Sequence, residues 1–421
     1  MIIKEEKNSY GVLVNICIVL IWLTVFYSSI IQHKYLQISH GMLILGLITL
    51  CIYIMAHCFC PYDILGTITI ETRVLLAYMI YMLFAGAFFS PDVDSHIEQW
   101  ITSAQYLFLL ILISSLIQET KTDTFHWLLL IRAIILVYVF LMEPIYYGGH
   151  RYSISLEMNP NGLGMAFATG VWAALYQQQK RNISLIISFS VVVIFTYCVF
   201  KTGSRKALIA IGISVILWLL LCFFPSLKKC NRNKRILSVF VILIIIGISG
   251  WLFTKVYYDS VIATRMEDLL YETQEGNRSN MYRAGFDMFK TSPLFGIGYQ
   301  GFKYYYGLYS HATLVETPVS GGIIGAIIYF FAYYISIKRT IHCVWATREK
   351  TEYETEHMRA KMLLIMWGIM LFYTTCIIHQ YILDSYIVFG IIFGDTAYIE
   401  KRIGEYSLKM PKVRIGSKYI K

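Results

Sequence analysis

Three cations and a serine stand together in the stretch KTGSRKALIAI, residues 201–211, between two long apolar runs. Gly203 and Ser204 predict the start of a helix, with Ser204 as its N-cap. Arg205 then falls in the first turn, where a cation opposes the helix dipole unless an anion lies nearby. A guanidinium beside a helix N-terminus suits a diphosphate, because both offer donors to its oxygens. We therefore predict that Ser204 and Arg205 bind a diphosphate.

A second cation is expected at another helix N-terminus, in the long polar stretch 257–318. Asn277 or Ser279 caps a predicted helix there, so that Arg278 lies beside the cap. Arg283 follows on the same helix. A predicted helix start thus lies next to an arginine here as well, as it does at Ser204 and Arg205.

That second helix is predicted to be amphipathic. Its residues Tyr282, Phe286 and Phe289 recur at i, i+4 and i+7, which gives one apolar face. We expect this face to lie on the membrane surface or over the rest of the protein. Pro293 ends the helix, and aromatic residues crowd 299–309. They are typical of an interfacial belt, and stacking on sugar faces is an alternative that the sequence leaves open.

His311 closes the polar stretch just before an apolar run, and Glu316 follows five residues later. A carboxylate at this spacing can orient an imidazole ring or tune its pKa, which suits a general base. The competing interpretation is a histidine that is only polar surface. We predict His311 and Glu316 as the catalytic residues.

The composition indicates what must position these residues. Hydrophobic residues make up 57% of the 421 and charged residues only 15%, where a soluble domain has about a quarter charged. Apolar stretches of about 20 residues, each long enough to cross a bilayer, recur along the chain. We predict an all-α polytopic membrane protein with about twelve spans. The candidate spans are near 11–31, 41–59, 72–90, 103–118, 125–146, 160–177, 183–200, 206–224, 236–256, 318–337, 361–379 and 381–399.

Lysines and arginines set the expected orientation, because they are retained on the cytoplasmic side. The cluster KKCNRNKR (228–235) and the basic tail fall on one side, which places both termini in the cytoplasm. The net charge of +10 is then a matter of topology and contact with anionic lipid, and nucleic-acid binding is excluded. Four segments result: spans one to nine in 1–256, an extracytoplasmic loop with short helices in 257–318, spans ten to twelve in 319–399, and a basic cytoplasmic tail in 400–421.

In this topology Lys201, Arg205 and Lys206 lie outside, where the rule disfavours cations. Snorkelling along the membrane surface would explain them without a ligand. A bound anion explains them better, because it also accounts for the cation in the first turn of the helix.

Three segments resemble, in their order and spacing, the O-antigen ligase and O-antigen polymerase family of bacterial envelope glycosyltransferases. They are SRKALIAI, then GNRSNMYRAGFDMFKTSPLFGIGYQGF, then SHATLVETPVSGGIIGAIIYF. A fourth, RYSISLEMNPNGLGMAFATG (151–170), resembles the Pro-Asn-containing loop of that family. The resemblance implies diphosphate contacts for Arg205 and Arg278, and a loop-end histidine role for His311. Arg151 and Arg283 join the expected diphosphate set. Where the family usually has asparagine after the histidine, this chain has Ala312.

The resemblance implies glycosyl transfer on the outer face of the bacterial cytoplasmic (inner) membrane, from a glycan carried on polyprenyl diphosphate. A polymerase would extend lipid-linked repeat units into capsule or O-antigen, and a ligase would use a different lipid acceptor. We favour the polymerase, because the lysine, isoleucine, tyrosine and asparagine usage suggests an AT-rich genome. No cofactor or metal is expected, since arginines neutralise the leaving group. Expected partners are the lipid-linked oligosaccharide, membrane lipid, a flippase and a chain-length regulator.

A polysaccharide or glycolipid transporter is the alternative class. Such folds show two similar halves and ionisable residues along a path through the membrane. The sequence has no internal repeat, and ionisable residues such as Arg132, Glu143 and Asp384 are few in the predicted spans. These features favour the enzyme, although Arg132 has no explanation from the sequence.

Overall fold

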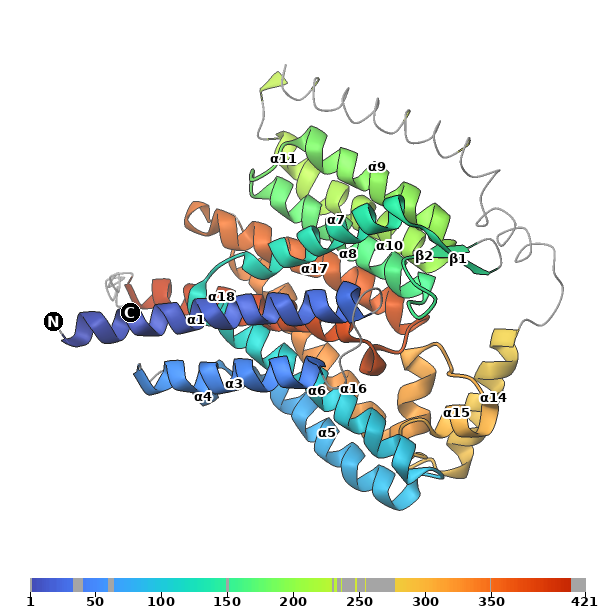
Figure 1. Cartoon of the computed structure of the whole chain (residues 1–421). Coiled ribbons are helices and arrows are strands. Elements are labelled where there is room, and N and C mark those ends of the chain that lie inside the picture. The colour runs from blue at the N-terminus through green and yellow to red at the C-terminus, as the bar shows by residue number, and fades with distance from the viewer. Residues whose placement is uncertain are drawn as a thin grey trace, which may run out of the picture.

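The protein is a bundle of long helices that lie side by side (Figure 1). The computed structural model describes residues 2–32, 41–59, 64–148, 151–228, 277–348 and 350–409, with a few isolated positions between 231 and 254. Helix α1 begins and helix α18 ends at one end of the bundle, which we call the terminal end. The strands β1 and β2 and the helices α14 and α15 lie at the opposite end, which we call the hairpin end.

The elements before the undescribed stretch are α1 Ile2–Phe26, η1 Tyr27–Ile31, α3 Gly41–Phe59, α4 Ile64–Thr67, α5 Ile70–Phe89, α6 Val93–Thr120, α7 Thr124–Met142, β1 Ile145–Gly148, β2 Arg151–Ser153, α8 Pro160–Gln179, α9 Leu185–Thr202, α10 Arg205–Trp218, η2 Leu219–Phe223 and α11 Phe224–Lys228. Those after it are α14 Asn277–Thr291, α15 Gly301–Tyr306, α16 Thr313–Ala346, η3 Thr351–Tyr353, α17 Glu354–Thr374, η4 His379–Tyr381 and α18 Leu383–Lys409.

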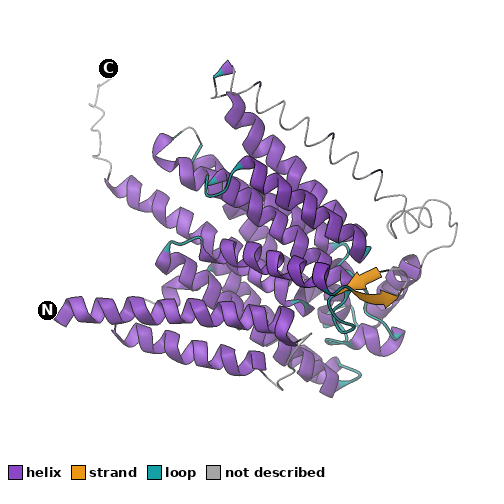
Figure 2. Cartoon of the chain, turned by 45° about the horizontal axis from the view of Figure 1, so that its top comes forward, coloured by secondary structure: helices purple, strands orange, loops and turns teal. Residues whose placement is uncertain are grey.

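The prediction of an all-α polytopic membrane protein is confirmed. Within the described ranges, eight helices are long and apolar enough to cross a membrane. Three further predicted spans form the long helices α8, α17 and α18. The predicted span at 236–256 falls outside the described residues, apart from isolated positions. Figure 2 shows the short antiparallel hairpin β1–β2 at the edge of the helices, an element that the sequence pattern did not predict.

Two helices extend well beyond the predicted spans. Helix α6 has 28 residues where 103–118 was expected, because Asp92 caps it and accepts a hydrogen bond from the Ser95 amide. Helix α16 has 34 residues and begins inside the stretch expected to be loop. The hydrocarbon runs therefore mark the centres of these helices, and polar turns continue them beyond.

Helix α8 is the centre of the fold, since nearly all of its side chains from Leu163 to Gln177 are buried. It packs against α7, α9, α10 and α17. Small residues allow this closeness: a Cβ atom at Gly170 would lie 2.4 Å from the Ala133 Cβ. Because α8 faces protein rather than lipid, it needs fewer large aliphatic residues than its neighbours.

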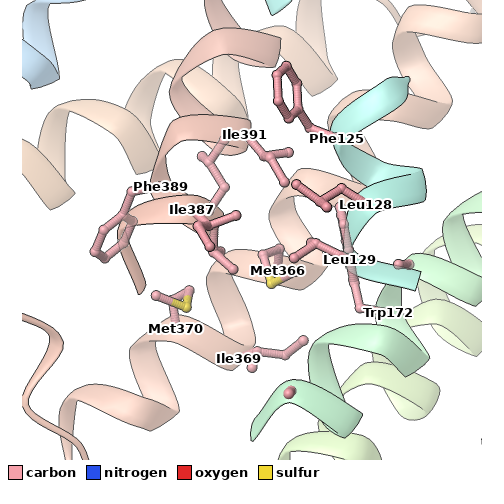
Figure 3. Close-up of a cluster of buried hydrophobic side chains, with 14 of the residues drawn as sticks. Phe125, Leu128, Leu129, Trp172, Met366, Ile369, Met370, Ile387, Phe389 and Ile391 are labelled. Carbon is pink, nitrogen blue, oxygen red and sulfur yellow. The ribbon is translucent and has the colours of Figure 1, made fainter. Parts of the chain in front are cut away.

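The contact between α7, α8, α17 and α18 forms a core of buried hydrophobic side chains (Figure 3). Trp172 of α8 points into it and is fully buried. Its indole N–H donates to the Met362 carbonyl oxygen of α17 at 2.8 Å, so the one polar atom of this side chain is satisfied. This packing joins α8 to α17.

Charged side chains meet in pairs at the terminal end. Asp123 lies between α6 and α7 and accepts hydrogen bonds from Lys180 and Arg359. Burial alone would raise the pKa of Asp123, but Arg359, His126 and Lys180 together lower it to about 2. The carboxylate is therefore ionised at neutral pH, and it joins α8 and α17 to the α6–α7 connection.

Arg132, unexplained by the sequence, pairs with Asp384 inside the bundle. The guanidinium Nη2 lies 2.7 Å from the Asp384 Oδ1, and the Arg132 side chain is 4% exposed. A buried charge is tolerated in a membrane protein where an opposite charge neutralises it. The pair joins α7 to α18.

Helix α16 is broken at Gly322, whose φ of 61° and ψ of −168° are not helical. The segment 293–298 occupies the break. The Ile297 amide donates to the Val319 carbonyl oxygen at 2.9 Å, and the Ile323 amide donates to the Pro293 carbonyl oxygen at 2.8 Å. Broken backbone is tolerated at membrane depth only where protein satisfies its polar groups, as this segment does. The break therefore anchors α14 and α15 to the bundle.

Helix α14 packs on the bundle by a face centred elsewhere than the predicted aromatic stripe. The helix buries Met281 and Gly285, while Tyr282 and Phe286 are exposed, Phe286 to 59%. Gly285 decides the face, because a Cβ atom there would lie 2.5 Å from the Val315 Cγ1 and only glycine lets α14 approach α16 so closely. The helix thus lies over the bundle, one of the two expected placements.

We expect Gly322→Ala to destabilise the protein strongly. The added Cβ would lie 2.2 Å from the Leu294 carbonyl oxygen, at a positive φ that alanine disfavours. Backbone strain of this kind costs about 1–3 kcal/mol, and the clash adds to it. The measurement is thermal unfolding of the detergent-purified protein.

The matched control is Gly212→Ala in α10, where the added Cβ meets nothing within 4 Å. Alanine favours a helix interior over glycine by about 1 kcal/mol, so this variant should unfold at the same or a higher temperature. Equal melting temperatures for both variants would contradict the account of the break.

Candidate functional site

The predicted helix start at Ser204 is confirmed. Gly203 ends α9 with a φ of 64°, and the Ser204 hydroxyl accepts a hydrogen bond from the Ala207 amide at 3.4 Å. Ser204 is fully buried, whereas Arg205, the first residue of α10, is half-buried. The guanidinium therefore belongs to the first turn of a capped helix, as the sequence indicated.

A second helix N-terminus lies directly beside the first. Asn159 caps α8, and its side chain accepts a hydrogen bond from the Asn161 amide at 2.9 Å. Pro160 occupies the first turn, where its missing N–H costs nothing. A Cβ atom at Gly164 would lie 2.9 Å from the Ser204 Cβ, so the two helices touch within a turn of their starts. Both positive dipole ends thus point toward the hairpin end.

Arg151 lies on strand β2 and joins these two helix starts. Its Nε donates to the Thr202 carbonyl oxygen at 2.9 Å, and its Nη2 donates to the Asn161 Oδ1 at 3.0 Å. The side chain is half-buried. The hairpin therefore places a second guanidinium at the position where α8 begins and α9 gives way to α10.

His311 lies at the start of α16 and is exposed. Its φ of 58° is in the left-handed region, which residues other than glycine adopt only uncommonly. Glu316, one turn into the helix, is fully buried. The sequence predicted that Glu316 orients the imidazole. Its described hydrogen bonds go instead to the Ser310 hydroxyl at 2.6 Å and the Tyr381 hydroxyl at 3.0 Å.

One short segment joins the two groups of candidate residues. The carbonyl oxygens of residues 375–377, just after α17, accept hydrogen bonds from three other elements. Lys206 of α10 donates to the Cys376 carbonyl oxygen. The Thr313 amide of α16 donates at 2.8 Å to that of Ile377. The Tyr282 hydroxyl of α14 donates at 3.2 Å to the Thr375 carbonyl oxygen. The starts of α10 and α16 and the middle of α14 therefore meet at one turn.

The remaining two predicted arginines belong to α14. Arg278 lies in its first turn, as expected, but the position of its side chain is outside what the structure describes. Arg283 is exposed. Tyr282, between them in sequence, contacts the 375–377 segment and brings this helix to the site. Diphosphate contacts by Arg278 and Arg283 stay predictions.

Sequence reasoning missed two participants and the hydrogen-bond partner of a third. Asn161 holds the Arg151 guanidinium, and the Asn-Pro-Asn run at the start of α8 was its only signal. Lys206 stood in the cationic stretch, but its carbonyl partner lies 170 residues away. Tyr381 was missed because nothing in its local pattern separates it from the many other tyrosines.

The site offers an anion two helix N-termini and the cations of Arg151, Arg205 and Lys206. An exposed imidazole is anchored to the same turn as Lys206, through Thr313 of α16. This arrangement can hold a strongly charged leaving group and accept a proton at the same end of the bundle.

A comparison with protein families supports this interpretation. A family model described as O-antigen ligase matches residues 190–330, from α9 through α10 and α14 into α16. The matched region includes Ser204, Arg205, Arg278 and His311. No curated protein matches the chain. By this match, the region from α9 into α16 is similar to the O-antigen ligase family.

Proposed function

We propose that the protein transfers a glycan from a polyprenyl diphosphate to an acceptor hydroxyl at the hairpin end of the bundle. Members of the matched family are glycosyl-transferring enzymes, which supports the general class of the reaction. The observation that carries the specific proposal is the pair of adjoining helix N-termini, α8 and α10, with Arg151 and Arg205 beside them. The hairpin end would then face outward from the bacterial cytoplasmic membrane, with both termini in the cytoplasm.

The chemistry of the leaving group accounts for the cations. As the bond between the sugar carbon and the phosphate oxygen breaks, the electron pair stays on the diphosphate, whose charge rises. Helix N-terminal amides and guanidinium groups aimed at that oxygen lower the barrier, because they stabilise charge that develops in the transition state. Two guanidinium groups can each bind two phosphate oxygens, which a lysine ammonium cannot do.

The acceptor hydroxyl must lose a proton as its oxygen bonds to the sugar carbon. His311 is the proposed base, because its imidazole is exposed at the hairpin end and its helix is held by the same turn that holds Lys206. The proton passes to the imidazole and then to solvent. Charge and atoms balance with no further reactant.

We propose polymerisation of lipid-linked repeat units, for capsule or O-antigen, as the specific reaction. Ligation to a different lipid is the alternative. Purified protein given a single lipid-linked repeat unit distinguishes the two, because a polymerase uses it as both donor and acceptor and yields a ladder. A ligase yields product only when a second lipid is added. A flippase would supply the donor, and a chain-length regulator would limit the product.

Transport is less well supported than transfer. A transporter requires charged groups along a path through the membrane. In the described part of the chain, Arg132 instead pairs with Asp384, and Asp123 pairs with Lys180 and Arg359 at the terminal end. These pairs join helices to one another, which favours a rigid scaffold for chemistry at the hairpin end.

We expect Arg205→Ala to lower turnover by about 10²–10³-fold, the usual cost of removing one donor to a developing charge. Arg205→Lys should recover little, since a point charge does not reproduce the planar fork. Arg348→Ala, which removes an exposed guanidinium beyond the far end of α16, is the matched control and should keep normal activity. Normal ladder formation by Arg205→Ala in the purified system would eliminate the diphosphate site.

His311→Ala should reduce chain growth by about 10²–10⁴-fold, the usual contribution of one general base. Binding of the lipid-linked donor should persist, because it depends on the arginines. The assay measures ladder length on a gel and donor retention on the immobilised protein. A ladder of wild-type length from this variant would show that the histidine is not the base.

Turnover should be unchanged by chelation with EDTA, because arginines rather than a metal ion neutralise the leaving group in this mechanism. The measurement compares initial rates before and after chelation and dialysis. A rate that falls on chelation and returns with Mg²⁺ or Mn²⁺ would replace the arginine mechanism by a metal-assisted one.

A further inference from the structure

We infer that Glu316, Ser310 and Tyr381 are positioning residues, which hold the His311 backbone in a strained conformation that presents its imidazole to the acceptor. The inference rests on the proposed function, in which His311 is the base. It begins from the φ of 58° at His311, since a residue other than glycine is strained in this region. Such strain persists only where the surroundings enforce it.

The residues on both sides of His311 are fixed by hydrogen bonds. The Ser310 amide donates to the Glu316 Oε2 at 3.3 Å, and the Ser310 hydroxyl donates to the same oxygen at 2.6 Å. The Ala312 amide in turn donates to the Ser310 hydroxyl oxygen at 3.5 Å. The Glu316 carboxylate and the Ser310 hydroxyl thus fix the residues on either side of the histidine. We call the hydrogen bonds among Ser310, Glu316 and Tyr381 the bracket.

The other flank is held by Thr313. Its amide donates to the Ile377 carbonyl oxygen at 2.8 Å, and its hydroxyl oxygen accepts from the His379 amide at 2.9 Å. The start of α16 therefore cannot rotate relative to the turn after α17. His311 is the exposed residue between two immobilised neighbours.

Tyr381 completes the bracket from the opposite side. Its hydroxyl donates to the Glu316 Oε1 at 3.0 Å and accepts from the Gln300 amide at 3.4 Å. Its ring meets those of Tyr299 and Tyr309 edge-on, with centroids 5.7 and 5.8 Å apart. Both oxygens of the carboxylate are thereby hydrogen-bonded, as a buried carboxylate requires.

This geometry gives Glu316 an indirect role toward His311. A fully buried carboxylate whose oxygens are both bonded to hydroxyl groups cannot reach an acceptor sugar. It acts through the backbone of Ser310 and not by proton transfer to substrate. A misplacement of about 1 Å in a catalytic group can cost on the order of 10²-fold in rate, so the bracket matters for turnover.

The test uses Ser310→Ala and Tyr381→Phe, which each remove one hydroxyl, with Glu316→Gln as the stronger change. In purified full-length protein we expect each to lower kcat by roughly 10-fold to 10²-fold, with KM for the lipid-linked donor unchanged. The control is Tyr373→Phe, whose buried hydroxyl lacks a hydrogen-bond partner within the described ranges, and it should keep wild-type kcat and KM.

Each substitution is then repeated in a His311→Ala background. If the bracket acts through the imidazole, Ser310→Ala and Tyr381→Phe cause no further loss there, because the group they position is gone. Wild-type kcat in both single variants would overturn the inference. An equal loss in both backgrounds would do so as well, since it would assign them a general structural role.

Failure of the proposed function gives a different result. A His311→Ala variant with wild-type turnover would remove the base itself, whatever the bracket variants do. If His311→Ala is impaired while Ser310→Ala and Tyr381→Phe are not, the base stands and only the positioning inference is wrong.

Discussion

The hairpin end depends on three consecutive carbonyl oxygens, those of residues 375–377. They follow the end of α17, where helical hydrogen bonding stops and carbonyl groups need other donors. Lys206, Tyr282 and Thr313 supply those donors from α10, α14 and α16. A helix end that would otherwise be unsatisfied thus becomes the junction that gathers cations and histidine from distant parts of the chain.

That junction is only as rigid as the bundle behind it. Helix α8 is buried on all sides, and the ion pairs of Asp123 tie it to α17 at the terminal end. Any rotation of α17 would therefore move the 375–377 turn and break contacts at both ends. The charged network and the apolar core serve the same purpose, which is to keep two helix N-termini and one imidazole in fixed relative positions.

Features that depend on a few neighbouring residues were predicted correctly from the sequence. Hydrophobic runs located the spans, and Gly203-Ser204 predicted a capped helix start, because both signals act within a few residues. The face by which α14 packs on the bundle was not predicted, because Gly285 packs more closely than the larger aromatic residues at 282 and 286. Partners such as Asn161, Tyr381 and the 375–377 carbonyls were not predictable, since contacts between segments far apart in sequence leave no periodic signal. The break in α16 was not predictable for the same reason.

The strain at His311 follows from the same division between local and distant contacts. Locally, a histidine disfavours positive φ, and Glu316 at a helical spacing from Ala312 would simply extend the first turn of α16. Only the distant Tyr381, by taking the second carboxylate oxygen, leaves the first oxygen committed to Ser310. The conformation of the proposed base is thus decided by a residue 70 positions later in the chain. The connection between α17 and α18 therefore controls both halves of the site, the cations through Cys376 and the histidine through Tyr381.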